Sequence, residues 1–470
     1  MNNVKKTSTH LAIYAAGNLV IKLIGLVLLP IYTSHLSVKD FGIYAIFEIS
    51  AQIAIAVIGL NLSTGMLKWI SDELDFSKRG EIIFTTFVMS FSIAILFSIS
   101  LFFSANYLSQ TFFGNSKYSL IISFLSINIC LEIINKIPIN VIRYLEKPAF
   151  YSVTLIIRFL VSTIAIIFFV VYQNLGISGI FLGFIIGNIV YFFSTLPIIK
   201  SKMKFVFNKD KATEIMNFSA PMVLGSLSMM LFTSSDRYII KIFRPFEEVG
   251  LYSFAAKISN IVNLLIVQSF NLALLPMFLK IYKFEKGKQF LISISKLIVI
   301  LIGFILIGIS YFGYDFLNLL IVNNNYLKSF NIIIILVFAY IFNALRYIFM
   351  LQLYASEKTK VISFLMLFTA ITNILLNVIF INIWHYKGAA YATLISTILM
   401  TFGFYYYGQK YYAVKYRVGQ FSIIIISTLL FLLFAKFIPN STVFYILKII
   451  LLFVYLGWLY FLKIFNLKLS

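Results

Sequence analysis

Long apolar stretches recur along the whole chain and are separated by short polar segments. Each stretch is close to the about 20 residues that an α-helix needs to cross the hydrocarbon layer of a membrane. The stretches are continuous and lack the apolar–polar alternation of a barrel strand, so they predict helices. Fourteen membrane-spanning helices are expected, at 11–31, 41–65, 81–104, 118–141, 151–172, 179–199, 214–243, 250–279, 291–313, 328–352, 361–383, 388–410, 421–437 and 443–463. The pattern predicts an all-α polytopic membrane protein.

The composition excludes a water-soluble globular protein. Hydrophobic residues make up 61% of the 470-residue chain and charged residues 11%, whereas soluble domains have about 45–50% and about 25%. The single cysteine, Cys130, lies inside an apolar stretch. An intrachain disulfide and a cysteine-rich metal site are therefore excluded, and we expect neither a cofactor nor a bound metal.

Lysines and arginines are unevenly distributed between the two sides of the predicted membrane region. With a cytoplasmic N-terminus, the outer segments hold only Lys39, Lys117, Arg244, Lys328, Lys387 and Lys436, and the other loop lysines and arginines fall in cytoplasmic segments. The positive-inside rule then places both termini in the cytoplasm. The net charge of +22 reflects this orientation and attraction to an anionic inner leaflet, so we expect no nucleic-acid binding.

Three short matches recur along the chain at a nearly constant shift of about 210 residues, which is typical of an internal repeat. The matched segments are 42–44 with 250–252, 146–147 with 357–358, and Gly179 with Gly388. They favour two parallel copies of a six-helix bundle, related by an axis along the membrane normal. We therefore expect an N-terminal lobe over 1–210, a C-terminal lobe over 211–412, and two additional helices over 413–470.

Motifs in the first, second, seventh and eighth predicted spans resemble a known family. They are Leu29-Pro30-Ile31-Tyr32, Leu36-Ser37, Phe41-Gly42-Ile43-Tyr44, Ala220-Pro221, Asp236-Arg237-Tyr238-Ile239-Ile240 and Val249-Gly250-Leu251-Tyr252-Ser253. With the span number and the repeat, they resemble the bacterial polysaccharide-repeat-unit flippases (the O-antigen or Wzx type) of the multidrug/oligosaccharidyl-lipid/polysaccharide exporter superfamily.

This resemblance implies two six-helix lobes around a V-shaped cavity in the bacterial plasma (inner) membrane. It also implies that a lipid-linked oligosaccharide moves to the outer leaflet by alternating access, as in O-antigen and lipopolysaccharide biosynthesis. Glycan polymerase and assembly proteins are the partners to expect beside the lipid bilayer. The resemblance does not specify which glycan is carried.

Basic side chains outnumber acidic ones within the predicted spans. The basic residues are Lys22, Lys136, Arg158, Arg237, Lys241, Lys257, Lys296, Arg346 and Lys448, and the acidic residues are Glu48, Glu132 and Asp236. A charge at the bilayer centre costs at least ~2.5–3.5 kcal/mol, so each should face protein or water. Lys241, Lys296 and Lys448 lie near span ends and are expected to snorkel to the interface. Glu132 and Lys136 have the favourable i,i+4 order, so a local structural ion pair and a functional pair both stay open.

Lys22 lies too deep in the first span to snorkel, and Asn18 shares its helical face. Lys257 and Asn260 belong to a polar stripe that continues at helical spacing to Asn271 in the eighth span. Such stripes usually pack against other helices. Because the resemblance implies a cavity lined by the first, second, seventh and eighth spans, these side chains are expected to bind substrate.

Arg158 and Arg346 lie near the cytoplasmic ends of the fifth and tenth spans. Each can either snorkel or hold a phosphate with its bidentate guanidinium. With Lys22 and Lys257, they predict a cationic site for the pyrophosphate of a polyprenyl-pyrophosphate-linked oligosaccharide.

The chain contains no phosphate-binding loop of the form G-x-x-x-x-G-K-[ST], so a proton, sodium or substrate gradient is the expected energy source. Glu48 is the candidate for ion coupling. Asp236 and Arg237 match the Asp-Arg pair of the resembled family, and a structural role near the outer end of the seventh span is expected.

Three other functions are considered. A multidrug exporter of the same fold needs buried carboxylates for cationic drugs, and the excess of bases disfavours it. A polysaccharide polymerase, an enzyme, should carry arginines and histidines in a long outer loop, but the longest outer segment, 314–327, has neither. A flippase for a peptidoglycan precursor or teichoic acid stays open.

Overall fold

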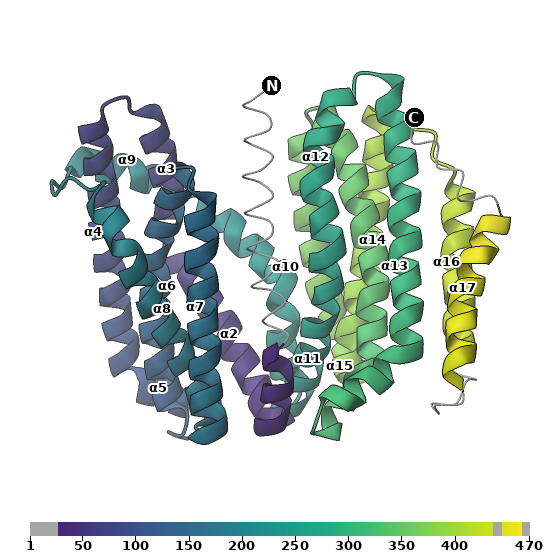
Figure 1. Cartoon of the computed structure of the whole chain (residues 1–470), viewed down its shortest axis with the longest axis horizontal. Helices are drawn as coiled ribbons and strands as arrows, with labels where there is room; N and C mark the ends of the chain where they lie inside the picture. Colours follow the sequence, from purple (N-terminus) through teal and green to yellow (C-terminus); the bar gives the residue numbers. More distant parts are fainter. Residues whose placement is uncertain (1–26, 436–443, 463–470) are drawn as a thin grey trace. The chain divides into compact units, whose positions relative to one another are not determined.

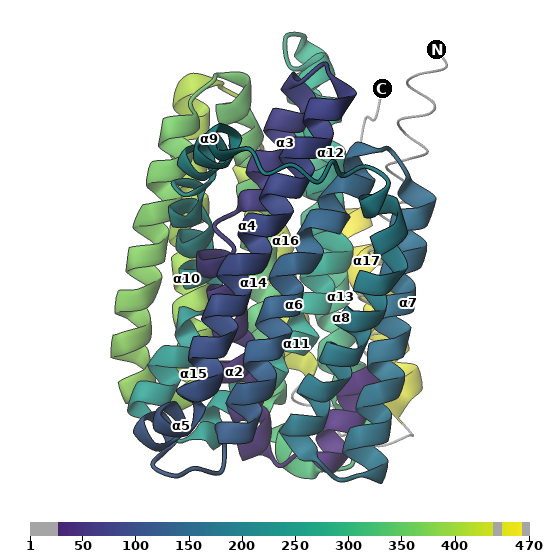
Figure 2. The ribbon, with the colours of Figure 1, turned by 90° about the vertical axis from the view of Figure 1, so that its left-hand side faces the viewer.

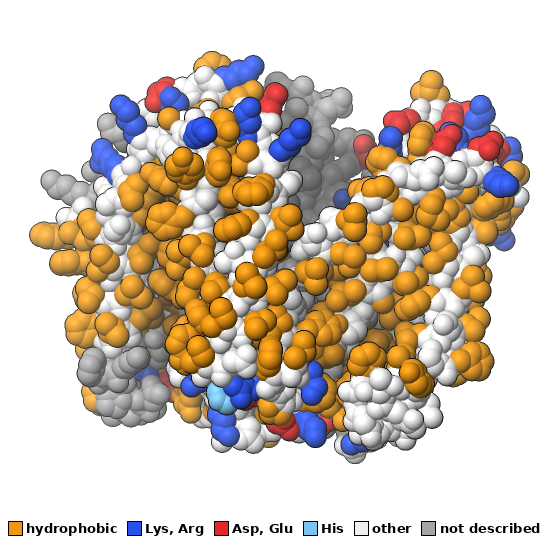
Figure 3. Space-filling view, turned by 180° about the vertical axis from the view of Figure 1, so that it is seen from behind, with side chains coloured by type: hydrophobic (Ala, Val, Ile, Leu, Met, Phe, Trp, Pro, Cys, Tyr) orange, Lys and Arg blue, Asp and Glu red, His pale blue; other side chains and the backbone are white. Residues whose placement is uncertain are grey.

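The computed structural model describes residues 27–435 and 444–462, and the regular elements within these ranges are helices. The chain forms two compact units, Met1–Thr233 (unit 1) and Ser234–Ser470 (unit 2). Of the described helices, nine are long and apolar enough to cross a membrane, and a tenth is added if the bent segments 209–228 and 233–243 form one span. Figure 3 shows apolar side chains over the middle of one face, with lysines and arginines toward its ends. This distribution suits a belt of lipid around the protein.

Unit 1 consists of long antiparallel helices with shorter ones at their ends (Figure 1). Its elements are α2 (Val38–Ile58), α3 (Leu62–Asp72), α4 (Phe76–Phe103), α5 (Ala105–Phe113), α6 (Ser119–Tyr144), α7 (Pro148–Ile167), the π-helix η1 (Phe168–Tyr172), α8 (Gly176–Lys200) and α9 (Lys209–Ser219). Figure 2 shows α4, α6 and α8 side by side, and α6 packs against both neighbours. The next helix, α10 (Met222–Phe243), crosses the boundary between the units.

Two predicted spans are interrupted in the structure, one within unit 1 and one that runs from unit 1 into unit 2. The span expected at 41–65 ends as α2 at Ile58, because Leu60 and Asn61 have positive φ angles and the chain turns before α3. The span expected at 214–243 is divided between α9 and α10. Pro221 lies at this division, where it cannot donate a backbone hydrogen bond to continue the helix.

Three glycines on α8 allow it to approach α7 closely. Gly179, Gly183 and Gly187 recur every four residues, so they lie on one face of the helix. A Cβ atom on Gly187 would lie 1.8 Å from the hydroxyl oxygen of Ser162 and 2.8 Å from the carbonyl oxygen of Arg158. Small residues at this spacing are typical of closely packed membrane helices. This contact brings the middle of α7 beside α8.

Unit 2 repeats the use of long packed helices. After α10 its elements are α11 (Phe246–Val262), the π-helix η2 (Asn263–Gln268), α12 (Ser269–Ile281), α13 (Glu285–Leu320), the 3₁₀-helix η3 (Asn324–Ser329), α14 (Phe330–Ala355), α15 (Thr359–Tyr411), α16 (Val418–Ala435) and α17 (Tyr445–Phe461). Non-helical backbone at Trp384 and His385 divides α15 into two parts. The division matches the predicted gap between the spans 361–383 and 388–410.

The matched segments 146–147 and 357–358 have the same geometry in the two units. Glu146 and Glu357 each have a positive φ, of 51° and 57°. The following amide of Lys147 donates to the carbonyl of Ile142, and that of Lys358 to Leu353, five residues back in both cases. This bonding pattern is a Schellman C-cap, which ends α6 and α14 alike.

Two of the lysines expected to snorkel are largely buried, and one of them forms an ion pair instead of reaching the interface. Lys448 on α17 is 1% exposed, and its amine donates to Asp315 Oδ2 on α13 at 3.2 Å. Lys296 on α13 is 6% exposed. Asp315, the partner of Lys448, belongs to a segment that the sequence predicts outside the membrane. The ion pair attaches α17 to α13 within unit 2.

Candidate functional site

A cluster of polar side chains lies inside unit 1, where α6, α7 and α8 meet. It contains Asn128, Glu132 and Asn135 on α6, Arg158 on α7, and Asn188 on α8. The three α6 residues recur at intervals of three and four and so share a face. Gly187, which directly precedes Asn188 in the stripe of glycines Gly179, Gly183 and Gly187, lets the backbone of α8 approach α7 closely.

Glu132 accepts a hydrogen bond from Nη2 of Arg158, and the two form an ion pair between α6 and α7. The Nδ2 atom of Asn188 donates to Asn128 Oδ1 at 2.9 Å and to Glu132 Oε1 at 3.4 Å. Asn135 donates to the backbone carbonyl of Asn188 at 3.0 Å. The carboxylate of Glu132 therefore connects three helices.

Glu132 pairs with Arg158 on another helix and not with Lys136, the local partner that the i,i+4 spacing suggests. Lys136, one helical turn along α6, forms no hydrogen bond or ion pair with any described residue, although the Glu132 charge acts on it. Arg158 takes the carboxylate because its guanidinium has five donors in a planar fork. The ion pair is partly accessible, with Arg158 and Glu132 side chains 21% and 30% exposed. Arg158 thus keeps N–H groups that can bind a further acceptor.

Arg346, on α14 of unit 2, is 3% exposed. Its Nε donates to Asn343 Oδ1 at 3.0 Å, and its guanidinium lies 3.8 Å from the centre of the Tyr347 ring. Its Nη1 is buried and has no hydrogen-bond partner among the described residues, and no described carboxylate pairs with the guanidinium. Burial of this side chain contradicts the snorkelling alternative.

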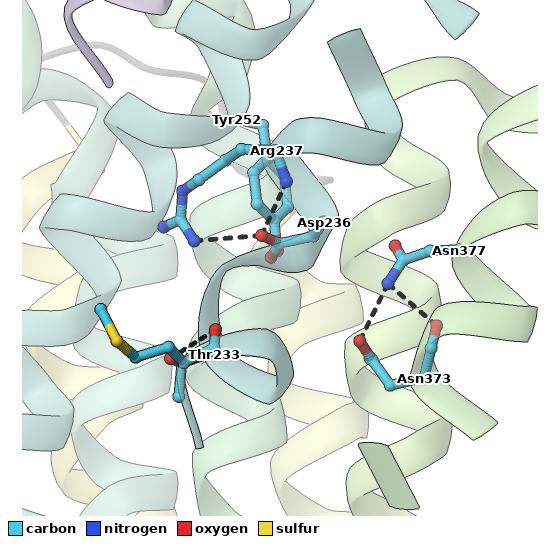
Figure 4. A network of polar contacts seen from close by, with 7 residues as sticks. Thr233, Asp236, Arg237, Tyr252, Asn373 and Asn377 are labelled. Carbon is cyan, nitrogen blue, oxygen red and sulfur yellow. Dashed lines mark hydrogen bonds and ion pairs between the residues drawn. The ribbon is translucent and has the colours of Figure 1, made fainter. Parts of the chain in front are cut away.

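Asp236 and Arg237 form a hydrogen-bonded network with Tyr252 inside unit 2 (Figure 4). The Tyr252 hydroxyl donates to Asp236 Oδ2, while the amide and Nη1 of Arg237 donate to Oδ1 at 2.8 and 3.0 Å. Asp236 is 8% exposed. Both carboxylate oxygens thus accept hydrogen bonds, and the bond from Tyr252 connects α10 to α11. Figure 4 also shows Asn377 donating to Asn373, at 2.9 Å to its side-chain oxygen.

Lys257 and Asn260 lie on α11, where Lys257 is partly buried and Asn260 is exposed. Asn263 donates to Asn260 Oδ1 at 3.0 Å, and the side-chain oxygen of Asn263 is buried without a partner among the described residues. The polar stripe expected along the eighth span does not continue in one register, because η2 follows at Asn263. A π-helix has more residues per turn than an α-helix, so residues beyond η2, such as Asn271, are rotated away from the Lys257 face.

Glu48 lies on α2 and is half-buried. The hydroxyl of Tyr44, a fully buried residue one turn earlier, donates to Glu48 Oε1 at 3.1 Å. Lys22 and Asn18 lie outside the described residues. Within the described part of the chain, no three His, Cys, Asp or Glu side chains come together in a way that could hold a metal ion.

The chain matches a protein family in sequence and known transport proteins in fold. The family model described as "Polysaccharide biosynthesis protein" matches residues 9–282. The fold is similar to that of lipid II flippase MurJ in an inward closed conformation, with a TM-score of 0.75 and 16% identity over 94% of this chain and 97% of that chain. No curated protein matches the sequence.

Multidrug transporters share the same fold. An inward-facing multidrug resistance MATE family transporter of the MOP superfamily gives a TM-score of 0.66 with 12% identity, over 86% of this chain and 98% of that chain. The Vibrio cholerae MATE transporter VcmN in its bent form gives 0.57 with 14% identity, over 91% and 99%. At these identities the similarity shows the fold, and it confirms the predicted all-α polytopic membrane architecture.

Proposed function

Since the chain belongs to the polysaccharide biosynthesis protein family and has the fold of MOP-superfamily transporters, we propose that it is a flippase for a lipid-linked oligosaccharide. It moves a polyprenyl-pyrophosphate-linked repeat unit from the cytoplasmic to the outer leaflet of the bacterial plasma membrane by alternating access. Fourteen spans, with both termini in the cytoplasm and lobes at 1–210 and 211–412, belong to the same proposal. The two additional helices expected at 413–470 are also part of the proposal.

The observation that carries this proposal is the burial of Arg346 without a carboxylate partner among the described residues. An unpaired charge in a protein interior costs several kcal/mol, of the order of 3–5 where a partner has been removed from a buried pair. The pyrophosphate of the substrate would supply the missing negative charge. A guanidinium suits this role because it binds two phosphate oxygens with parallel N–H donors.

Lys257 and the N-terminal Lys22 are proposed to act with Arg346 on the same anionic group. Asn18 and Asn260 would donate to the sugar or phosphate oxygens. Arg158 can contribute only the N–H groups that Glu132 leaves, so its binding should be weaker. These polar side chains handle the head group, while the polyprenyl tail requires no polar path.

Glu48 is proposed as the site of proton or sodium coupling. It is a half-buried carboxylate that already accepts a hydrogen bond from Tyr44. A carboxylate within a membrane-spanning helix can take up a proton or bind a sodium ion, so it can couple transport to either gradient. Transport driven through Glu48 would need no nucleotide hydrolysis.

The test is complementation of a flippase-deficient cell by variants of Arg346. Arg346→Gln should reduce surface polysaccharide at least tenfold, and Arg346→Lys should restore part of it because the positive charge is kept. Lys286→Gln, which removes an exposed cation from α13, is the control and should behave as wild type. Full polysaccharide with Arg346→Gln, at wild-type amounts of protein in the membrane, would disprove the proposal.

A flippase for a peptidoglycan precursor is the second candidate, because the fold is similar to that of a lipid II flippase at a TM-score of 0.75. Both substrates carry a pyrophosphate, so the role of Arg346 is the same in each. Complementation separates them. Rescue of a lipid II flippase depletion, without rescue of surface polysaccharide, would favour the second candidate.

A further inference from the structure

A group of buried polar side chains without partners lies at one end of unit 2, around the segment that joins α15 to α16. Tyr416 is 8% exposed, and its hydroxyl has no hydrogen-bond partner among the described residues. The side-chain oxygen of Gln420, on the first turn of α16, is likewise buried without a partner in that part of the chain. A buried hydroxyl or amide without a hydrogen bond costs about 1–3 kcal/mol. The Tyr416 hydroxyl can donate a hydrogen bond, so an acceptor group on a ligand would satisfy it.

The segment 412–417 is held in place by hydrogen bonds to its neighbours. The hydroxyl of Tyr412 donates to the carbonyl of Tyr282 at 2.5 Å, and Gln352 donates to the carbonyl of Tyr412 at 2.7 Å. The Tyr416 ring packs against Phe349 and Phe421, with ring centres 5.2 and 6.2 Å apart. The unpartnered hydroxyl therefore belongs to a side chain held by helix packing.

Lys296 on α13 lies beside the first turn of α16. A Cβ atom on Gly303 would lie 2.9 Å from Thr428 Oγ1, and the Tyr311 hydroxyl donates to the carbonyl of Phe431 at 3.0 Å. Both contacts advance along the two helices in the same direction, so α13 and α16 run parallel. Seven residues before Gly303 and Thr428, about 10 Å along each axis, are Lys296 and Phe421.

Two cations meet at this place without an acidic partner. Lys296 is 6% exposed, and Arg417, an exposed residue directly before α16, lies within electrostatic reach of it. Neither side chain pairs with a carboxylate of any described residue. Two like charges repel, so their closeness is unfavourable unless an anion lies between them. The first turn of α16 adds the positive end of the helix dipole and the backbone N–H groups of Val418 and Gly419, whereas the amide of Gln420 donates to the carbonyl of Arg417 at 2.8 Å.

We propose that Lys296, Arg417 and the first turn of α16 bind a phosphate group, with the Tyr416 hydroxyl as an additional hydrogen-bond donor. The site lies at the end of unit 2 that the lysine and arginine distribution assigns to the cytoplasm. Basic sites between helices at that surface are typical of anionic lipid head groups. Val418 and Ile426 on α16 are 49% and 56% exposed, so an apolar surface for acyl chains is adjacent. A phosphodiester of an anionic phospholipid is therefore the favoured source of the phosphate.

The experiment measures the thermal transition of the purified full-length protein with three probes. They are phosphatidylglycerol, zwitterionic phosphatidylethanolamine and inorganic phosphate, each added to delipidated protein in detergent. We expect phosphatidylglycerol to raise Tm by several degrees and phosphatidylethanolamine to have no effect. A rise with inorganic phosphate alone would support the site and identify a soluble anion as the ligand.

Two variants and a control assign the effect to this site. Lys296→Met should abolish the rise, while its Tm without lipid should equal or exceed that of the wild type, because an unpaired buried charge has been removed. Arg417→Gln should reduce the rise at least by half. Lys415→Gln removes an exposed cation of the same segment and should leave the rise unchanged.

An equal rise in the wild type and in Lys296→Met would overturn the proposal, as would a rise with none of the anionic probes. Neither result bears on the substrate proposed above, since Arg346 is not changed. Conversely, loss of transport by Arg346→Gln with a normal lipid response would leave this site intact. The two proposals are therefore tested independently.

Discussion

Arg158 donates a hydrogen bond to Glu132 across the contact between α7 and α6, although Lys136 lies only one turn from Glu132 on the same helix. The choice of partner has an energetic reason. The planar guanidinium of Arg158 binds the carboxylate while its central carbon lies 5.8 Å from the centre of the Tyr191 ring. A cation–π contact is favourable at this distance. An i,i+4 pair on one helix is worth only about 0.2–0.5 kcal/mol, so a contact between helices outweighs it.

Removal of one partner of this pair should be more destabilising than removal of both. Glu132→Gln leaves the Arg158 guanidinium partly buried without a counter-charge, and we expect a loss of about 1–3 kcal/mol. Arg158→Gln together with Glu132→Gln should recover part of this loss, because amides can replace the charged hydrogen bond. Thermal unfolding of the four proteins of this double-mutant cycle measures the coupling. Additive effects would show that the pair contributes nothing.

The apolar stretches alone predict most of the long helices, because a helix that crosses lipid must be apolar over nearly its whole length. Apolar composition does not show where a helix ends within a continuous apolar stretch. The turn at Leu60 and Asn61 lies within the expected span 41–65, where the apolar run continues into α3. The π-helix η2 is likewise invisible in composition, and it removes Asn271 from the face of Lys257.

Ion pairs were harder to predict, because only local pairs can be read from spacing. Asp315 and Lys448 are far apart in sequence, and their contact depends on how α17 packs on α13. For Arg158, the sequence does carry a pattern that indicates which helices pack together. The spacing of Gly179, Gly183 and Gly187 predicts a close approach to another helix, and in the structure that helix is α7, which carries Arg158.

The glycine stripe of α8 should tolerate no side chain. Gly187→Ala would place a methyl group 1.8 Å from the Ser162 hydroxyl oxygen and 2.8 Å from a backbone carbonyl oxygen. Overpacking of this kind costs about 1–3 kcal/mol, and we expect a lower Tm. Gly308→Ala is the matched control on α13, where a Cβ meets nothing within 4 Å. This variant should be neutral or stabilising, since alanine favours a helix by about 0.5–1 kcal/mol.

His385 has a strained backbone at the break in α15. Its φ of 56° and ψ of −147° lie in a region populated almost only by glycine. His385→Gly and His385→Ala both lose the 2.9 Å contact between His385 Nδ1 and Glu248, so their difference isolates the backbone. The glycine variant should be the more stable by about 1–3 kcal/mol. Equal unfolding temperatures of the two variants would show that the backbone strain is absent.

The ion pair of Lys448 and Asp315 leads to the largest expected change in stability. Lys448 is 1% exposed, and the Asp315 carboxylate accepts a hydrogen bond from its amine at 3.2 Å. Asp315→Asn therefore leaves a buried ammonium group without its counter-charge, and we expect a loss of about 3–5 kcal/mol. Lys448→Met in the same chain removes that charge and keeps the volume of the side chain, so the double variant should regain most of the stability. Thermal unfolding of the two variants beside the wild type decides between a buried pair and a lysine that reaches the interface, because a snorkelling lysine would make Asp315→Asn nearly neutral.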